Sequence, residues 1–196
     1  MIPEQSQVIF LFLALLGVQL VGNVAGAPSS ATEIVPDLEG LSIGDIINAL
    51  GIGLVQNITA IITLDSLTTN LIEQVSRLRN SVDFTAKNPL IIELTLDKVS
   101  TIAGVNNTVY ASFNHTFDPP VVVRPLETAD SGTIDNVLLV QGAINSLNII
   151  PLGELDLMDV NISVRAATID GFGGIPIPIN GLKQSDVPTT YTLDID

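Results

Sequence analysis

Residues 158–166 read MDVNISVRA, and this stretch decides the fold. Its even-numbered side chains, from Met158 through Ile162 to Ala166, are apolar, whereas the odd-numbered ones, such as Asp159 and Arg165, are polar. Successive side chains of a β-strand point to opposite faces of a sheet. Alternation over this length therefore predicts a strand with one buried face and one wet face.

The same alternation recurs along the chain. Further strands are predicted over residues 54–64, 82–87, 90–96, 108–117, 121–124 and 134–141. Residues 104–107 join two of these patterns as a hairpin turn, and residues 171–179, interrupted by Gly and Pro, predict an edge strand or an extended arm. About seven strands with short turns indicate a mainly β fold, an antiparallel immunoglobulin- or fibronectin-like β-sandwich.

One or two short helices precede most of the strands. Ser42 and Asp45 have the spacing of a capping box, apolar residues follow at helical spacing, and Gly51 suits the C-cap. A second helix is predicted over residues 71–79, where an apolar stripe includes Leu71 and Val75.

The beginning of the chain is typical of a secretory signal peptide. Residues 8–21 are almost entirely apolar, but the run is shorter than the roughly 20 residues that span a membrane. Small residues follow, and cleavage is predicted after Gly26. We therefore expect a signal peptide over 1–26, a flexible mature N-terminus over 27–40 and a single domain over 41–196, secreted to the extracellular space. The alternative is an uncleaved membrane anchor.

Composition excludes several function classes. The formal net charge of −14 disfavours nucleic acid and anionic lipid headgroups as partners. The absence of cysteine excludes thiol catalysis, zinc–thiolate sites and a disulfide framework.

Four N-glycosylation sequons are the strongest motif. They begin at Asn57, Asn106, Asn114 and Asn161. Three of these asparagines fall on the polar phase of a predicted strand, and Asn106 falls in the predicted turn. A glycan requires such solvent-facing positions, so we expect at least two of the four sequons to be used.

No catalytic set is recognisable. The single histidine, His115, falls on the inward phase of its strand, which favours a packed histidine over a catalytic base. The carboxylate pairs Asp156/Asp159 and Asp194/Asp196 are open to glycosidase or Ca²⁺ chemistry, but solvated faces explain them as well. We therefore predict no enzyme activity, cofactor or metal.

A family resemblance rests on residues 81–164. Here a strand ends in Asn88-Pro89, and a second strand, a hairpin and a third strand leading to Pro119-Pro120 follow. This order resembles the water-stress and hypersensitive-response domain of group-2 late-embryogenesis-abundant proteins, and related fungal secreted proteins of unknown function. The resemblance implies a β-sandwich without an active site, associated with desiccation, other stress or host interaction.

Three functions follow as hypotheses. The first is a non-catalytic structural, stress-protective or interaction protein of the cell surface, whose partner is an extracellular protein or a cell-wall component. The second is a binding module for a hydrophobic small molecule or lipid, because 46% of the residues are hydrophobic and only 4% are aromatic. Tyr110, on the outward phase, could stack on a sugar, but a single ring is weak evidence for a sugar-binding module. The third is a carboxylate-dependent hydrolase.

Overall fold

The computed structural model describes residues 43–50, 52–64 and 80–195. Helices in these ranges are short: α2 (Ile43–Leu50), α3 (Gly142–Ser146) and the 3₁₀ helix η2 (Leu147–Leu152). The helix predicted after Ser42 is confirmed as α2. The predicted signal peptide, the proposed caps Ser42 and Gly51, and the helix predicted over 71–79 lie outside the described residues.

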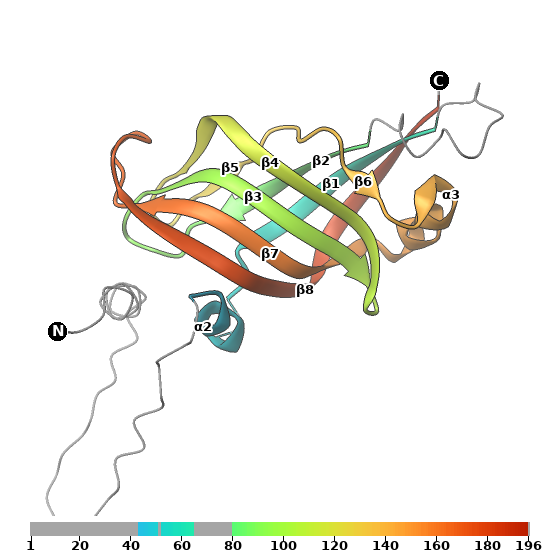
Figure 1. Ribbon diagram of the computed structural model, residues 1–196, viewed down its shortest axis with the longest axis horizontal. Helices are drawn as coiled ribbons and strands as arrows, with labels where there is room; N and C mark the ends of the chain where they lie inside the picture. The colour runs from blue at the N-terminus through green and yellow to red at the C-terminus, as the bar shows by residue number, and fades with distance from the viewer. Residues whose placement is uncertain (1–42, 51, 65–79, 196) are drawn as a thin grey trace, which may run out of the picture.

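Strands make up most of the described chain. They are β1 (Val55–Leu64), β2 (Ser81–Lys87), β3 (Leu94–Val105), β4 (Thr108–Val123), β5 (Thr128–Asp130), β6 (Leu138–Leu139), β7 (Glu154–Ala166) and β8 (Ile175–Ile195). All eight belong to one sheet in the order β5-β2-β1-β8-β7-β3-β4-β6 (Figure 1). The mainly β prediction is confirmed.

The sheet is mixed, so the prediction of a purely antiparallel fold is wrong. Strand β8 runs parallel to β1, from the pair Ile58 and Thr189 to the pair Leu64 and Ile195. The other strand pairings are antiparallel. Side-chain alternation carries no information on strand direction, because both kinds of pairing leave the two-residue period unchanged.

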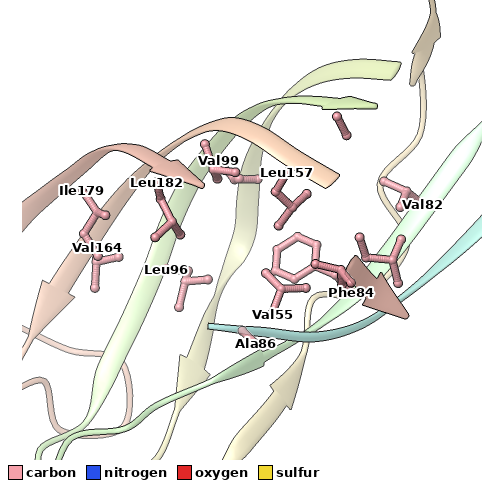
Figure 2. Close-up of a cluster of buried hydrophobic side chains, with 14 of the residues drawn as sticks. Val55, Val82, Phe84, Ala86, Leu96, Val99, Leu157, Val164, Ile179 and Leu182 are labelled. Atoms are coloured by element: carbon pink, nitrogen blue, oxygen red, sulfur yellow. The ribbon is translucent and has the colours of Figure 1, made fainter. Parts of the chain in front are cut away.

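The sheet curls until strands from its two ends face each other. The rings of Phe84 on β2 and Phe117 on β4 meet edge to face at 6.5 Å, although β1, β8, β7 and β3 lie between these strands in the sheet order. The core fills the hollow, and Figure 2 shows side chains from both halves of the sheet pointing into it. A backbone bridge between Val82 and Ile134 also ties the chain after β5 to β2.

β-Bulges change which residues of several strands face the core. On β3, Asp97 is an extra residue relative to β7, so the buried set changes from Leu96 to Val99, Thr101 and Ala103. Strand β3 also begins at Leu94 and not at the predicted residue 90. Further register shifts occur on β4 and β7 against β3, and in the pairings of β1 with β2 and of β7 with β8.

Thr95 lies inside, although the apolar even positions of the strand predicted over residues 90–96 place it on the solvent face. Thr95 has no exposed surface, and its hydroxyl lies 2.8 Å from the hydroxyl of Thr168. The connection after β7 therefore covers this part of the polar face of β3. Alternation within one strand could not reveal a covering segment from elsewhere in the chain.

Residues 171–179, predicted as an edge strand or an extended arm, include the start of the long strand β8. From Ile175, strand β8 pairs with β7, whereas its pairing with β1 begins at Thr189. The first half of β8 thus has one strand neighbour, as predicted for an edge, and the second half is central. The exposed prolines Pro176 and Pro178 lie in the half with one neighbour, where they remove backbone donors from the free side.

Helix α2 covers the edge beyond the prolines. The amide of Asn48 donates to the carbonyl of Gly181 at 2.9 Å and accepts from the backbone N–H of Lys183 at 2.7 Å. The side chain of Asn48 thereby replaces a neighbouring strand.

The other short predictions are mixed in outcome. Residues 82–87 are confirmed within β2. Residues 121–123 of the strand predicted over 121–124 form the end of β4, and Arg124 lies after it. The predicted strand over 134–141 shrinks to β6. The hairpin at 104–107 is confirmed, with Asn106 and Asn107 in the left-handed conformation that a tight turn requires.

Candidate functional site

A cavity of about 80 Å³ lies in the hollow of the curled sheet. Most of its wall comes from β1, β2, β3, β4 and β7, and single residues come from β6, β8, α3 and η2. None of the described side chains that line it is charged. For scale, a single water needs roughly 10–15 Å³, and an engineered apolar cavity of roughly 150 Å³ binds benzene. The volume therefore suits a small molecule.

The cavity wall is built from rows of cross-strand neighbours. Phe113 on β4, Thr101 on β3 and Val160 on β7 pair in register, and all three line the cavity. The next row along β3 holds two alanines, Ala103 and Ala111, which also line it. Small side chains in these central positions leave the space that larger ones would fill.

Three buried polar side chains interrupt this apolar wall. The amide of Asn80 donates to the carbonyl of Val137 at 3.4 Å, and the hydroxyl of Ser146 donates to the carbonyl of Gly142 at 2.9 Å. The buried hydroxyl of Thr101 is its only polar side-chain atom, and it has no hydrogen-bond partner among the described residues. The sequence did not identify Thr101, because a threonine in a strand is commonplace.

Both tyrosines of the chain line the cavity. The hydroxyl of Tyr191 donates to the carbonyl of Glu154 at 3.1 Å, and burial raises its pKa to about 12. Tyr110 was predicted to face outward, and this is wrong. The register of β4 against β3 moves from Ala111 to Val109, which makes Tyr110 the extra residue of a bulge and packs it against the core.

The predicted glycosylation sites lie on the outside of the sheet or at its turn. Asn57, Asn106 and Asn114 are exposed. Asn161 is half-buried and accepts a hydrogen bond from the backbone N–H of Gly181 at 3.1 Å. Asn114 and Asn161 pair with Ser100 from its two sides, so they share one row of the outer face. Glycan attachment stays a prediction.

The residues weighed for catalysis do not converge. His115 packs its ring against Phe117 at 4.9 Å, on the predicted inward phase. Asp156 accepts from the backbone N–H of Asp186 at 3.0 Å, and Asp159 accepts from the amide of Asn161 at 3.3 Å. Residue 196 of the second carboxylate pair lies outside the described ranges. Within those ranges, no group of three or more His, Cys, Asp or Glu side chains is placed to hold a metal ion.

A second apolar cavity, of about 20 Å³, lies where Ile47 of α2 meets Leu90 and Ile177. Its volume is close to that of a single water. No helix in the described ranges is both long and apolar enough to cross a membrane.

Comparisons with known proteins add little. No protein-family model matches the chain, and no curated protein matches it. Among solved structures, a protein from Archaeoglobus fulgidus aligns with 67% of this chain and 96% of its own, at 12% identity and a TM-score of 0.28. Likeness at this level carries no argument about fold or function.

Proposed function

We propose that this protein is a non-catalytic extracellular domain that binds a small apolar molecule in the cavity of its curled sheet. The observation that carries the proposal is the cavity itself, with its uncharged and almost wholly apolar wall. In this proposal the two facing halves of the sheet act as the two layers of the expected β-sandwich. Ligand contacts would then come from side chains that already form the core.

The energetic argument favours an occupied cavity. Empty core volume lowers stability by about 24 cal/mol for each Å³, so about 80 Å³ of empty space costs about 2 kcal/mol. Larger side chains at Ala103 or Ala111 would remove this cost. A ligand recovers it instead, because the wall atoms regain contacts that the void denies them.

The extracellular setting is part of the proposal. It is supported by the apolar leader and by three exposed sequon asparagines. The stress-protective, structural and interaction roles implied by the family resemblance stay predictions. Protection of a dried test enzyme beyond that given by serum albumin would support the stress role, and protection no better than albumin would count against it.

The ligand proposal has a direct test. Native mass spectrometry of protein secreted by its own host, extracted gently, should show an adduct that denaturation removes. The isolated apo protein should bind xenon, followed by NMR shifts of methyl groups in Ile58, Leu157 and Val160, which line the cavity. A clean apo mass together with no xenon response would end the proposal.

A filling variant provides the matched control. Ala111→Val should reduce xenon binding, because Ala111 lines the cavity. Ala129→Val adds the same atoms on β5 at a partly buried alanine that does not line it, and should leave binding unchanged. Equal xenon binding by both variants would place the site elsewhere.

A further inference from the structure

We infer that the ligand of this cavity is a neutral molecule that carries one hydrogen-bonding group, and that the hydroxyl of Thr101 binds this group. The inference rests on the proposed function and narrows it to a chemical class. Alcohols, ketones and ethers of small size belong to this class, whereas carboxylates and amines do not.

The placement of Thr101 is the first support. It is the middle member of the row formed with Phe113 and Val160, and only 4% of its surface is exposed. Val99 and Ala103, two residues away on either side along β3, are also buried and line the cavity. Side chains two apart on a strand share a face, so Thr101 belongs to the inner wall.

The second support is the state of its hydroxyl. Thr101 Oγ1 has no hydrogen-bond partner among the described residues. The other buried threonine hydroxyl of β3, that of Thr95, lies 2.8 Å from Thr168 Oγ1. Buried hydroxyl groups are nearly always paired, and leaving one unpaired is unfavourable. Thr101 therefore offers a hydrogen bond to whatever occupies the cavity.

The chemistry of the wall sets the class of ligand. A hydroxyl both donates and accepts, so it serves an alcohol as well as a carbonyl or ether oxygen. The described lining residues contain no charged side chain. An ionised ligand would be buried without a counter-charge, which is strongly unfavourable. A pure hydrocarbon would fill the space but leave Thr101 unpaired.

A buried water is the alternative occupant of the cavity beside Thr101. The volume holds water, and a water bound to Thr101 would satisfy the hydroxyl. The two cases differ in whether an added alcohol displaces the water from Thr101. A ligand-binding hydroxyl exchanges its water for an alcohol, whereas a structural water remains in place when alcohol is added.

The experiment compares two probes in three proteins. n-Propanol and n-butane differ by exchange of a terminal methyl for a hydroxyl, and methyl NMR shifts measure the affinity of each. Thr101→Val keeps the branched shape and removes the hydroxyl, whereas Thr101→Ser keeps the hydroxyl. Measured relative to n-butane, affinity for n-propanol should fall roughly tenfold in Thr101→Val, as expected for one net hydrogen bond, and persist in Thr101→Ser.

The apo protein gives an independent readout. Thr101→Val should raise the melting temperature of the empty protein, because it removes an unpaired buried hydroxyl. A high-resolution crystal structure with n-propanol should place the probe oxygen on Thr101 Oγ1.

The failures are distinguishable. If both probes bind but Thr101→Val leaves their affinity ratio unchanged, this inference is wrong and the apolar site stands. If the crystal structure holds a water on Thr101 that n-propanol does not displace, this inference is also wrong. If neither probe nor xenon binds, the proposed function fails as well.

Discussion

The buried side chain of Asn88 holds the connection after β2 against the end of β4. Its amide nitrogen donates to the carbonyls of Ile92 at 2.7 Å, Val123 at 3.0 Å and Arg124 at 3.1 Å, and its oxygen accepts from the N–H of Leu90 at 2.9 Å. One side chain thus satisfies four backbone groups, two in the connection after β2 and two at the end of β4. The Asn-Pro step that carried the family resemblance has this physical role.

Asn88→Asp should be strongly destabilising at neutral pH. The substitution replaces the donating nitrogen with a carboxylate oxygen that faces three carbonyls, and it buries a charge without a partner. Urea unfolding should show a loss of about 3 kcal/mol or more. Repulsion from the carbonyls raises the pKa of the new carboxyl, so the loss should shrink as the pH falls through that value.

The control for Asn88 is Asn148→Asp, which makes the same chemical change at an exposed position of η2. It should leave the free energy of unfolding within about 0.5 kcal/mol of the wild type. Equal stability of the two variants would show that the bonds of Asn88 contribute nothing.

The hydroxyl of Tyr191 should ionise at a higher pH than an ordinary tyrosine. Burial raises its pKa to about 12, chiefly because the phenolate loses hydration. In Tyr110→Phe, Tyr191 is the only tyrosine, and the chain has no tryptophan, so ultraviolet absorbance follows its titration directly. The folded midpoint should lie near 12 and the midpoint in urea near the ordinary value of about 10.

The same pKa shift determines how the free energy of unfolding depends on pH. A raised folded pKa means that the contribution of Tyr191 is fully present below a pH of about 10 and is lost as the pH rises towards about 12. Tyr191→Phe should remove this part of the alkaline dependence of unfolding. A folded midpoint near 10 in Tyr110→Phe would contradict the buried position of the ring.

At the scale of elements, α2 depends on a glycine for its contact with β8. A Cβ atom at Gly44 would overlap the carbonyl oxygen of Asn180, which belongs to the backbone and cannot turn aside. Gly44 is therefore a point of close approach between helix and strand, and it brings Asn48 within reach of the strand edge.

Gly44→Ala should destabilise the protein despite the better helix propensity of alanine. Overpacking against backbone costs about 1–3 kcal/mol, whereas propensity alone would stabilise by about 1 kcal/mol. The direction in which the melting temperature changes therefore shows whether overpacking or helix propensity dominates. Ala49→Gly, on the exposed side of α2, reports propensity by itself. A more stable Gly44→Ala protein would show that α2 is not held at this distance.

Arg165 fixes the connection between β7 and β8. Its guanidinium binds both carboxylate oxygens of Asp97 at 2.8 Å and donates to the carbonyls of Gly171 at 2.9 Å and Gly173 at 2.7 Å. A planar fork makes these contacts together, whereas an ammonium group cannot.

Arg165→Lys should loosen this connection without unfolding the protein. Amide exchange near residues 171–173 should quicken, while the global free energy of unfolding changes by less than about 1 kcal/mol because the ion pair is partly exposed. Arg124→Lys, at an exposed position after β4, is the control. Unchanged exchange in Arg165→Lys would mean that the carbonyl contacts do not order the connection.

Alternation predicted which residues of several strands face the core, but not where the phase changes. Val160 and Val164 are buried as the period requires. The bulges at Asp97 and Tyr110 leave no local signature, because either residue is also normal in a regular strand. The parallel pairing of β1 with β8 joins segments far apart in the sequence. Thr101 became a candidate only once its missing partner was visible.

At the scale of the whole molecule, the sequons belong to the outer surface, away from the cavity. Asn114 and Asn161 both pair with Ser100, and the side chain of Ser100 lies on the face of β3 opposite to Thr101. Sugars at these positions would cover the convex side of the sheet and leave the apolar wall untouched.

Glycosidase treatment of the secreted protein should lower its intact mass. Peptide mapping should locate glycans at Asn57, Asn106 and Asn114, which are exposed. Removal of the sugars should leave xenon binding unchanged, because the acceptor positions do not line the cavity. Protein that is secreted by its own host with all four asparagines unmodified would refute the glycoprotein prediction.

The place of β8 in the sheet has a consequence for synthesis. This strand is the last of the eight to leave the ribosome, yet it sits between β7 and β1 and joins the two halves of the sheet. A nascent chain therefore lacks the strand that connects its halves until residues 175–195 have been made. We therefore expect the two halves of the sheet to stay unjoined until this strand has left the ribosome.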